Sequence, residues 1–385
     1  MTAKELVESA SPSQSSDEVV TVGCPDAGKG SQVDKDYDVV VVGGGAAGLS
    51  GALTLARARR SVLVVDEGTP RNAPADGVHN YLGREGTPPA GLTAAGQAEV
   101  TGYGGTVVPG RVVAAHRPSD GGGFELTLDD GTQVASRRLL VTTGLVDELP
   151  DVPGLAERWG RDVLHCPYCH GWEVRDQAIG VLATGPVGPH QAELLRQWSP
   201  DVTLFLHTAP DLDRDQWIRL AARGIAVVDG EVTAVEVADD RITGLRLHTG
   251  RVVPCQAVVV VPRFVARAEL LTTLGLQTVE QKLGDHVLGT VVPADRTGAT
   301  AVDGVWVAGN VTDLQAGVIN AAAAGFTAAV AINADLVADD VRRAVTGHPR
   351  EGVGDRRVRA TAAPFSALVE AGVSERVLGA RRHGL

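Results

Sequence analysis

The stretch Asp38-Val-Val-Val-Val-Gly-Gly-Gly-Ala-Ala-Gly48 decides the fold of this chain. Its four consecutive valines form a short β-branched run that leads into a glycine-rich turn. An apolar pattern with helical spacing follows over Leu49 to Arg60, and a second strand is expected at Ser61 to Val65. This order of strand, glycine turn, helix and strand predicts a dinucleotide-binding unit.

The three spaced glycines of this turn have different expected roles. Gly43 allows the tight turn, Gly45 lets a pyrophosphate approach the backbone, and Gly48 lets the helix pack closely on the strand. The helix N-terminus favours phosphate groups. Asp66 ends the second strand, 23 residues after the first glycine, and can bind ribose hydroxyls. A glycine turn without a ligand would leave this acid unexplained.

A second motif, His165-Cys-Pro-Tyr-Cys-His-Gly171, carries the chemistry. Cys166 and Cys169 are three residues apart and can close a small disulfide, while the flanking imidazoles can move the protons that its opening and closing require. Thiol–disulfide exchange is therefore the first hypothesis.

Half of a zinc site is the alternative reading of this motif, because C-x-x-C beside histidine also has the spacing of metal ligands. A structural zinc site needs a second close pair of ligands, whereas Cys24 and Cys255 stand alone and far apart. The redox interpretation is favoured, and no metal is expected.

Length and composition indicate a soluble, globular protein of two domains or of one large domain. The 385 residues are 44% hydrophobic and 21% charged, with a net charge of -12. This acidity argues against a nucleic-acid partner or a membrane-binding patch. Met1 to Lys35 lacks the basic start and apolar centre of a secretory signal, so we expect a cytoplasmic protein in which a C-x-x-C pair is catalytic.

Further elements are expected on either side of the cysteine motif. A helix is predicted near Leu92 to Tyr103, and Asp129-Asp-Gly131 predicts a hairpin turn. A strand from Gly304 leads through a glycine turn into a helix over Ala316 to Val337, and Phe365 to Leu378 forms an amphipathic segment. Other strands are predicted at residues 105–108, 111–115, 124–128 and 138–142.

The segment after the cysteine motif repeats the nucleotide-binding layout with changes. Strands are expected at Ala178 to Ala183 and at Val202 to Leu206, but Ala183 replaces the first glycine. A 2'-phosphate would need arginines after the second strand, and Arg214 stands there among three aspartates. Both a nicotinamide site and a purely structural domain remain open. Cys255 is expected to be packed in the core.

In the order of these parts the chain resembles the low-molecular-weight thioredoxin reductase family over roughly residues 36–338. The resemblance implies an α/β fold of two Rossmann-like, three-layer domains, with the second inserted into the first, and it implies FAD and a homodimer. The expected parts are a disordered arm at 1–35, an FAD-binding domain at 36–150 and 287–338, an inserted NADPH-domain-like redox domain at 151–286, and a C-terminal extension at 339–385.

The resemblance also assigns the cofactor-binding residues. The pyrophosphate loop and the ribose acid match at the positions already named. Gly309-Asn310 stands where the family has Gly-Asp, and the Asn310 amide can still bind a ribityl hydroxyl. The strand-end Thr-Gly pair lies beside FAD in the family, and the Gln-Ala pair lies near the flavin ring. The residues carried over are Gly43, Gly45, Ala46, Ala47, Gly48, Asp66, Asn72, Thr143, Gly144, Gly309, Asn310, Gln315 and Ala316.

Two departures change the implied function. His170 follows the second cysteine where the reductases usually have Asp, and the arginine-bearing segment for NADPH is missing. Together with Arg71-Asn72 and the Gly-Asn ending, Cys-Pro-Tyr-Cys-His-Gly-Trp is similar to the dithiol oxidase branch, which includes the enzymes that close the disulfides of gliotoxin and holomycin. Members of this branch pass electrons to oxygen and do not use a nicotinamide.

The resemblance implies an FAD-dependent oxidation of a small dithiol, with oxygen reduced to hydrogen peroxide. Cys166 is the expected target of the substrate thiolate, and Cys169 is the expected partner of the flavin. His170 is the candidate base, with His165 in reserve, since an unperturbed imidazole pKa of about 6.5 suits proton transfer near neutrality. For either histidine the alternative is a solvent-facing side chain beside the motif.

Two other functions remain open at this point. The first is an NADPH-dependent reductase of a thioredoxin-like protein. The second is a non-catalytic flavoprotein whose disulfide controls binding to a partner.

Overall fold

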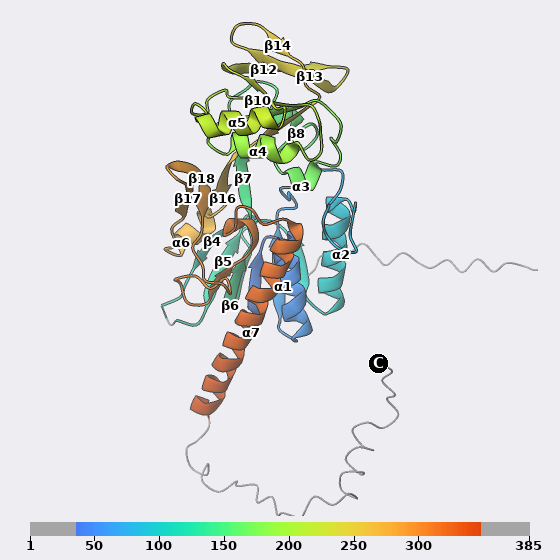
Figure 1. The fold of residues 1–385 in the computed structure, drawn as a ribbon. Helices are drawn as coiled ribbons and strands as arrows, with labels where there is room; N and C mark the ends of the chain where they lie inside the picture. The colour runs from blue at the N-terminus through green and yellow to red at the C-terminus, as the bar shows by residue number, and fades with distance from the viewer. Residues whose placement is uncertain (1–35, 120, 348–385) are drawn as a thin grey trace, which may run out of the picture.

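The computed structural model describes residues 36–119 and 121–347, which form two α/β domains stacked end to end (Figure 1). The first domain contains a seven-stranded sheet and the second a five-stranded sheet. The expected fold class, two Rossmann-like units, is confirmed. The predicted arm at 1–35 with Cys24, and the segment Phe365 to Leu378, lie outside the described residues.

The first sheet is built around the valine run of the opening stretch. Val39, Val40 and Val41 are fully buried, as expected for a central parallel strand covered on both faces. The strand order is β3-β2-β1-β6-β5-β4, with β19 beside β6. The strands are β1 (Asp36–Val42), β2 (Val62–Asp66), β3 (Thr106–Pro109), β4 (Val112–His116), β5 (Phe124–Leu128), β6 (Gln133–Val141) and β19 (Val305–Val307).

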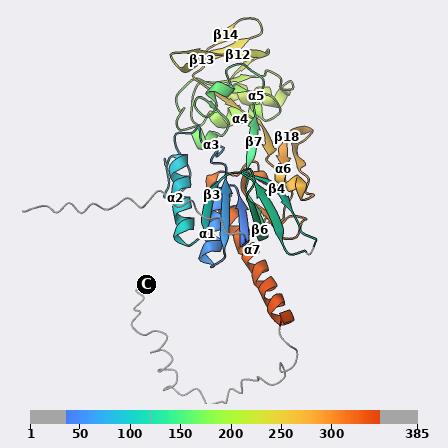
Figure 2. The same ribbon diagram turned by 180° about the vertical axis from the view of Figure 1, so that it is seen from behind.

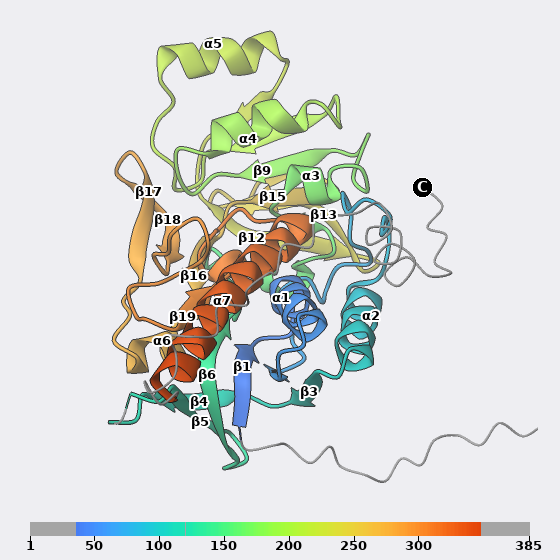
Figure 3. The same ribbon diagram turned by 90° about the horizontal axis from the view of Figure 1, so that it is seen from below.

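Three helices accompany this sheet: α1 (Ala46–Arg57), α2 (Pro89–Gly102) and α7 (Val318–Gly347) (Figures 2 and 3). Helix α1 begins and ends three residues earlier than predicted, because the last residues of the glycine turn already form its first turn and Arg59 adopts a left-handed φ of 65°. Helix α7 runs beyond the predicted end at Val337, so the expected boundary at 338 falls inside a helix.

Strand β6 also differs from the prediction, which began it at residue 138. It starts at Gln133 because its first half pairs with β5 in a hairpin, whereas its second half pairs in parallel with β1 and β19. The predicted turn at 129–131 is confirmed, since Gly131 has a φ of 86° and donates to the carbonyl of Leu128.

The second sheet is wholly parallel and has the order β11-β10-β9-β15-β8. Helix α4 (Gly188–Leu195) and helix α5 (Arg214–Ala222) follow two of its strands. Cys255 is 2% exposed, and burial raises the pKa of its thiol to about 12, so the prediction of a packed core residue is confirmed. The strands are β8 (Val163–Leu164), β9 (Ile179–Leu182), β10 (Val202–Phe205), β11 (Ala226–Val228) and β15 (Ala257–Val260).

A four-stranded sheet, ordered β17-β18-β16-β7, joins the domains. Strands β7 and β16 pair antiparallel and carry the chain out of the first domain and back again. The boundary expected at 286/287 falls at the start of β18, and the domain limits otherwise stay a prediction. The strands of this sheet are β7 (Leu145–Glu148), β16 (Arg263–Ala266), β17 (Val279–Leu283) and β18 (His286–Val291), and helix α6 (Glu269–Thr273) follows β16. A separate three-stranded hairpin sheet contains β12 (Val232–Ala238), β13 (Arg241–Leu247) and β14 (Val252–Val253).

Candidate active site

The glycine turn between β1 and α1 is shaped by close backbone contacts. Gly43 has a φ of 102°, a conformation that favours glycine. A Cβ at Gly48 would overlap the carbonyl oxygen of Gly43, so this position needs glycine for helix and strand to pack. The first N–H groups of α1 have no partner within the helix and no side-chain cap, so they are available to a ligand.

Asp66 is held at the end of β2 by the same turn. Its Oδ1 accepts a hydrogen bond of 2.9 Å from the backbone N–H of Gly44, which leaves Oδ2 available to a ligand. A Cβ at Gly44 would lie 2.7 Å from Cγ of Asp66. The middle glycine of the triplet therefore makes room for the acid, a role that the sequence analysis did not assign.

One cavity of about 1620 Å³ joins this turn to the cysteine motif. Sites for one small ligand commonly measure 300–1,000 Å³, so the cavity has room for a cofactor and a substrate together. Gly48 packs against the backbone of Gly43 and is not on the cavity wall, whereas the other predicted site residues all are. These are Gly43, Gly45, Ala46, Ala47, Asp66, Asn72, Thr143, Gly144, His165, Cys166, Cys169, His170, Gly309, Asn310, Gln315 and Ala316.

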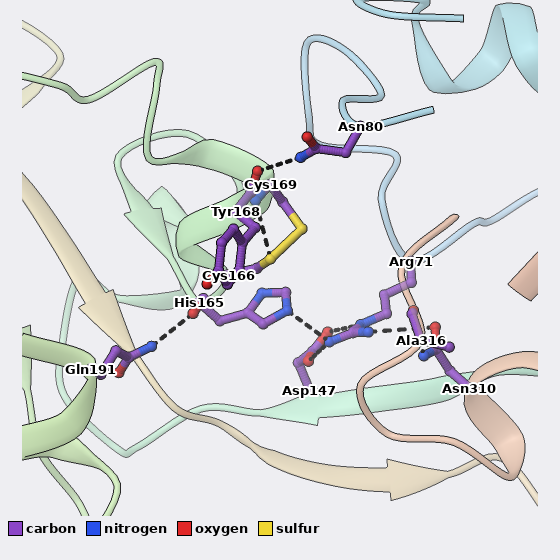
Figure 4. Close-up of a disulfide and its surroundings, with 10 residues drawn as sticks. All are labelled: Arg71, Asn80, Asp147, His165, Cys166, Tyr168, Cys169, Gln191, Asn310 and Ala316. Carbon is purple, nitrogen blue, oxygen red and sulfur yellow. Dashed lines mark hydrogen bonds and ion pairs between the residues drawn. A yellow bond between two sulfur atoms is a disulfide. The ribbon is translucent and has the colours of Figure 1, made fainter. Parts of the chain in front are cut away.

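The cysteines form a disulfide at the start of the short helix α3 (Pro167–His170). Their Cα atoms are 5.2 Å apart, and the backbone N–H of Cys169 donates to Sγ of Cys166 at 3.1 Å (Figure 4). Pro167 occupies the first helical position, where its missing N–H costs no hydrogen bond. Both sulfur-bearing residues are half-buried on the cavity wall.

Arg71 connects the first domain to the cysteine motif. Its guanidinium forms a bidentate ion pair with Asp147 at 2.7 and 2.6 Å, and its Nη2 lies 3.3 Å from Nε2 of His165 (Figure 4). Because Arg71 can only donate, Nε2 of His165 must accept and the ring proton lies on Nδ1. Burial and the neighbouring Arg71 lower the pKa of His165 to about 4.

His170 has a different environment, since it lies at the C-terminal end of α3 and is half-buried. Burial lowers the pKa of His170 below its usual value; Glu173 acts in the opposite direction, and His79 adds to the lowering. His170 is therefore neutral at physiological pH and able to accept a proton. The strongly lowered pKa of His165 makes that histidine the weaker candidate for the base.

The segment after β19 is tied together by Asn310, which lies in the short helix η2 (Gly309–Val311). Its Nδ2 donates to the carbonyls of Asp313 and Ala316 at 2.9 and 3.0 Å, while Oδ1 lies 3.5 Å from Nη1 of Arg71. Both Nδ2 donors are thus engaged, and a ribityl hydroxyl would have to donate to Oδ1. Thr143 likewise uses its hydroxyl to donate to the carbonyl of Arg267 at 2.6 Å.

Three side chains at the cysteine end were not assigned by the sequence analysis. Asp147 orients Arg71, and Asn80 Nδ2 donates to the carbonyl of Tyr168 at 2.6 Å. Gln191 Nε2 donates to the carbonyl of His165 at 2.8 Å, and its buried Oε1 has no partner among the described residues. These contacts join segments far apart in the sequence, and no local pattern signals them.

Comparison with known proteins agrees with this geometry. The family described as pyridine nucleotide-disulphide oxidoreductase matches residues 37–328. The chain belongs to this family. Members are oxidoreductases, and this pyridine nucleotide-disulphide oxidoreductase carries the cysteine pair that thiol–disulfide chemistry requires.

Relatives of this pyridine nucleotide-disulphide oxidoreductase include thioredoxin reductases of fungi. Thioredoxin reductase aclD of Aspergillus oryzae is 33% identical over 240 residues, which are 57% of this chain and 76% of that protein. Thioredoxin reductase sirT of Leptosphaeria maculans is 28% identical over 79% of this chain and 96% of its own length. Thioredoxin reductase tcpT of Claviceps purpurea is 39% identical over 39% of this chain, and the match spans about half (48%) of its length.

The crystal structure of HlmI resembles this oxidoreductase with a TM-score of 0.74 and 46% identity, over 83% of this chain and 98% of HlmI. The oxidoreductase from Agrobacterium tumefaciens gives a TM-score of 0.72 and 32% identity, over 78% of this chain and 99% of that chain. The predicted resemblance to thioredoxin reductase-like flavoproteins is confirmed.

Proposed function

We propose that the protein is an FAD-dependent dithiol oxidase, which forms a disulfide in a small dithiol and reduces oxygen to hydrogen peroxide. By analogy with the branch that the chain resembles, the dithiol would be a natural product. The observation that carries the proposal is the single cavity whose wall includes both the glycine turn and the Cys166–Cys169 disulfide. A cofactor in the turn and a substrate at the disulfide would then exchange electrons without a protein partner between them.

The residues present fit FAD at the first glycine turn. A Cβ at Gly45 would meet no described atom within 4 Å, and Gly45 has an ordinary φ of -75°, so neither packing nor backbone strain demands glycine there. Its position on the cavity wall suits a site that a pyrophosphate approaches closely. Asp66 would bind the ribose, Gly309 and Asn310 the ribityl chain, and Gln315 and Ala316 the ring region.

When bound, FAD would take the electron pair from the cysteines and transfer it to oxygen. The chain's own part begins when a substrate thiolate attacks Sγ of Cys166, which breaks the disulfide and releases Cys169 as a thiolate. The second substrate thiolate then attacks the substrate sulfur of the mixed disulfide. This step forms the substrate disulfide and releases Cys166 as a thiolate, so the cysteine pair as a whole has gained two electrons.

Proton transfer in this scheme is assigned to His170. Each attacking thiol must lose its proton, and a neutral imidazole on the cavity wall can accept it. His165 is held by Arg71 with the ring proton on Nδ1, and it would instead fix the backbone that leads into Cys166. Arg71 and Asp147 are therefore positioning residues that join the two ends of the cavity.

The alternative is an NADPH-dependent reductase, and the second nucleotide unit disfavours it. A Cβ at Gly185 would collide with the imidazole of His286, so this ring lies against the turn where a pyrophosphate would bind. Asp213, after β10, caps helix α5 by accepting from the backbone N–H of Gln216 at 2.7 Å. Asp213 thus has a structural use, and a 2'-phosphate after this strand would meet negative charge.

The test of this proposal is the fate of oxygen during thiol turnover. Purified protein with bound FAD, given dithiothreitol in air, should consume oxygen and release one hydrogen peroxide for each disulfide formed. Turnover that requires NADPH and releases no peroxide would support the reductase.

We further propose a cytoplasmic homodimer that has neither a nucleic-acid nor a membrane partner.

A further inference from the structure

A histidine and two carboxylates form a cluster beside the cysteine motif. His79 lies in the loop between β2 and α2. Its Nδ1 is 2.6 Å from Oε1 of Glu85 in the same loop, and its Nε2 is 3.5 Å from Oε1 of Glu173, which follows α3. The cluster therefore joins the first domain to the segment that carries His170.

Both ring nitrogens of His79 face carboxylate oxygens. A neutral imidazole has one N–H and can donate to one of them, whereas a protonated ring donates to both. Hydrogen bonds from His79 and from the backbone N–H of Asn80 lower the pKa of Glu85, so this carboxylate stays ionised and able to accept. The ring can thus take a proton on one nitrogen and release another from the opposite nitrogen.

Glu173 is next to both histidines. Its backbone N–H donates to the carbonyl of His170 at 3.2 Å, while its carboxylate faces His79. Burial lowers the pKa of His170; beyond that, the charge of Glu173 raises this pKa and the charge of His79 lowers it further. His165 also interacts with His170, but its own pKa of about 4 leaves it uncharged near neutral pH. His79 and His170 are therefore electrostatically coupled.

The cluster leads from the cavity toward solvent. His79 and His170 are both on the cavity wall, whereas Glu85 and Glu173 are not among its lining residues. The exposed fraction of the side chain is 22% for His79, 41% for Glu173 and 67% for Glu85. A proton that reaches either carboxylate can therefore pass to water.

The proposed reaction releases protons at the cysteines. Each dithiol loses two protons and two electrons when its disulfide forms, and the electron pair goes to the disulfide of Cys166 and Cys169. His170 is the group assigned to accept the protons. An imidazole that has accepted the first proton must lose it before it can accept the second. Because His170 is half-buried, its proton needs a way out.

We infer that His79, Glu173 and Glu85 carry protons between His170 and solvent, with His79 as the central group. His170 passes its proton to Glu173 and His79, and His79 releases one to Glu85 or to water from its other nitrogen. Only protons move, and Glu85 becomes a carboxylate again when water takes the proton. His79 acts through His170 and not on the sulfur atoms. The inference rests on the proposed dithiol oxidation, in which His170 is the base.

The experiment measures oxygen uptake by the full-length, FAD-loaded protein with dithiothreitol, in the presence and absence of added imidazole. His79→Gln should lower kcat/KM about 3- to 10-fold, because proton exit then depends on water alone, and imidazole should restore most of the loss. The matched control is His116→Gln. This histidine is also paired with a glutamate, Glu125 at 2.8 Å, but it is 61% exposed and not on the cavity wall.

His116→Gln should turn over like the wild type and should not respond to imidazole. Equal turnover in His79→Gln and His116→Gln, or a loss in His79→Gln that imidazole does not restore, would overturn the inference. A merely structural role of His79 would give this second result, since free imidazole cannot rebuild a contact between two segments of the chain.

The pH profile gives a readout with opposite signs at two positions. Loss of the His79 charge should move the acidic limb of kcat/KM to higher pH, because His170 then binds its proton more tightly. Glu173→Gln should move this limb to lower pH. Asn80→Gly removes the hydrogen bond to the carbonyl of Tyr168 but no titratable group, so it should leave the limb in place (Figure 4). Shifts of the same sign at His79 and Glu173 would contradict the coupling.

An NMR titration of His170 in the same FAD-loaded proteins separates this inference from the oxidase proposal, because it needs no turnover. The pKa of His170 should be higher in His79→Gln and lower in Glu173→Gln than in the wild type. Equal midpoints in all three proteins would overturn the inference even if the wild type releases peroxide. Opposite shifts in a protein that releases no peroxide would support the coupling of the two histidines and overturn the oxidase proposal.

Discussion

The chain contains two glycine turns at equivalent places in two similar sheets, and the structure treats them differently. In the first turn, Gly45 faces the cavity and α1 offers free N–H groups. In the second, Ala183 stands in the first glycine's place and the ring of His286 lies on Gly185. The same local layout can therefore serve as a ligand site or as a packing element, and the side chains that distant segments bring to it decide which.

Substitution of the cysteines has the largest expected effect, because it removes the thiol chemistry at one end of the cavity and leaves the cofactor end unchanged. Cys166→Ser and Cys169→Ser should each lower dithiol turnover by at least about 1000-fold, since neither variant can form the disulfide. Both should still bind FAD, because the first glycine turn is intact. Steady-state oxygen uptake and the flavin content of each variant measure the two effects. A variant that retains turnover would refute the disulfide relay.

A matched pair of alanine substitutions tests the comparison itself. Gly45→Ala should weaken FAD binding by roughly 10- to 100-fold, as its methyl group would enter the space of the pyrophosphate, and should leave the apoprotein's stability unchanged. Gly185→Ala should show the reverse. It should keep its FAD affinity but lose about 1–3 kcal/mol of unfolding free energy through the clash with His286. FAD titration by fluorescence and urea unfolding measure each pair of values. Equal effects on FAD at both positions would show that the turns are not distinct.

His170 should control the pH dependence of turnover. The lowered pKa of His170 places the acidic limb of kcat/KM below about pH 6.5, where the imidazole becomes protonated and can no longer act as a base. His170→Ala should slow turnover about 10- to 100-fold and move the optimum to higher pH, where substrate thiols ionise without help. His248→Ala, an exposed histidine of the far hairpin sheet, is the control. An unchanged profile in His170→Ala would remove this residue from the role of base.

The smallest expected effect concerns stability and His165. Its folded pKa of about 4 lies below the unfolded value of about 6.5, so the unfolded chain binds more protons between these limits. The unfolding free energy should fall by up to about 3 kcal/mol as pH drops from about 6.5 to about 4. His165→Gln should flatten this slope in urea titrations, whereas His248→Gln should not. An equally steep slope in His165→Gln would show that the acid sensitivity arises elsewhere.

The sequence was sufficient for those parts of the fold that local patterns determine. The valine run, the glycine turn and the acid at Asp66 predicted the first unit, because β-branched runs and positive φ angles have local signatures. Helix α7 was predicted too short, since its last turns are held by Arg60 and Arg137 from distant strands and loops.

In the candidate site, too, sequence motifs predicted some features, and others depend on tertiary contacts. The positions on the cavity wall followed from motifs, whereas the electrostatics of His165 depend on Arg71, which is 94 residues away in the sequence. Asp147 and Gln191 carry no local signal, because each acts only through a contact made in the folded chain. The covering of Gly185 by His286 is also a tertiary contact, and it carries the strongest structural argument against NADPH.

The most direct test of the central claim is anaerobic reduction of the bound flavin. The FAD-loaded protein would receive dithiothreitol in one cuvette and NADPH in another, and the flavin's visible absorption band would be followed. The account predicts bleaching by the dithiol alone, reversed by air with release of hydrogen peroxide. Rapid bleaching by NADPH, with no response to the dithiol, would contradict it and would make the second nucleotide unit a working site.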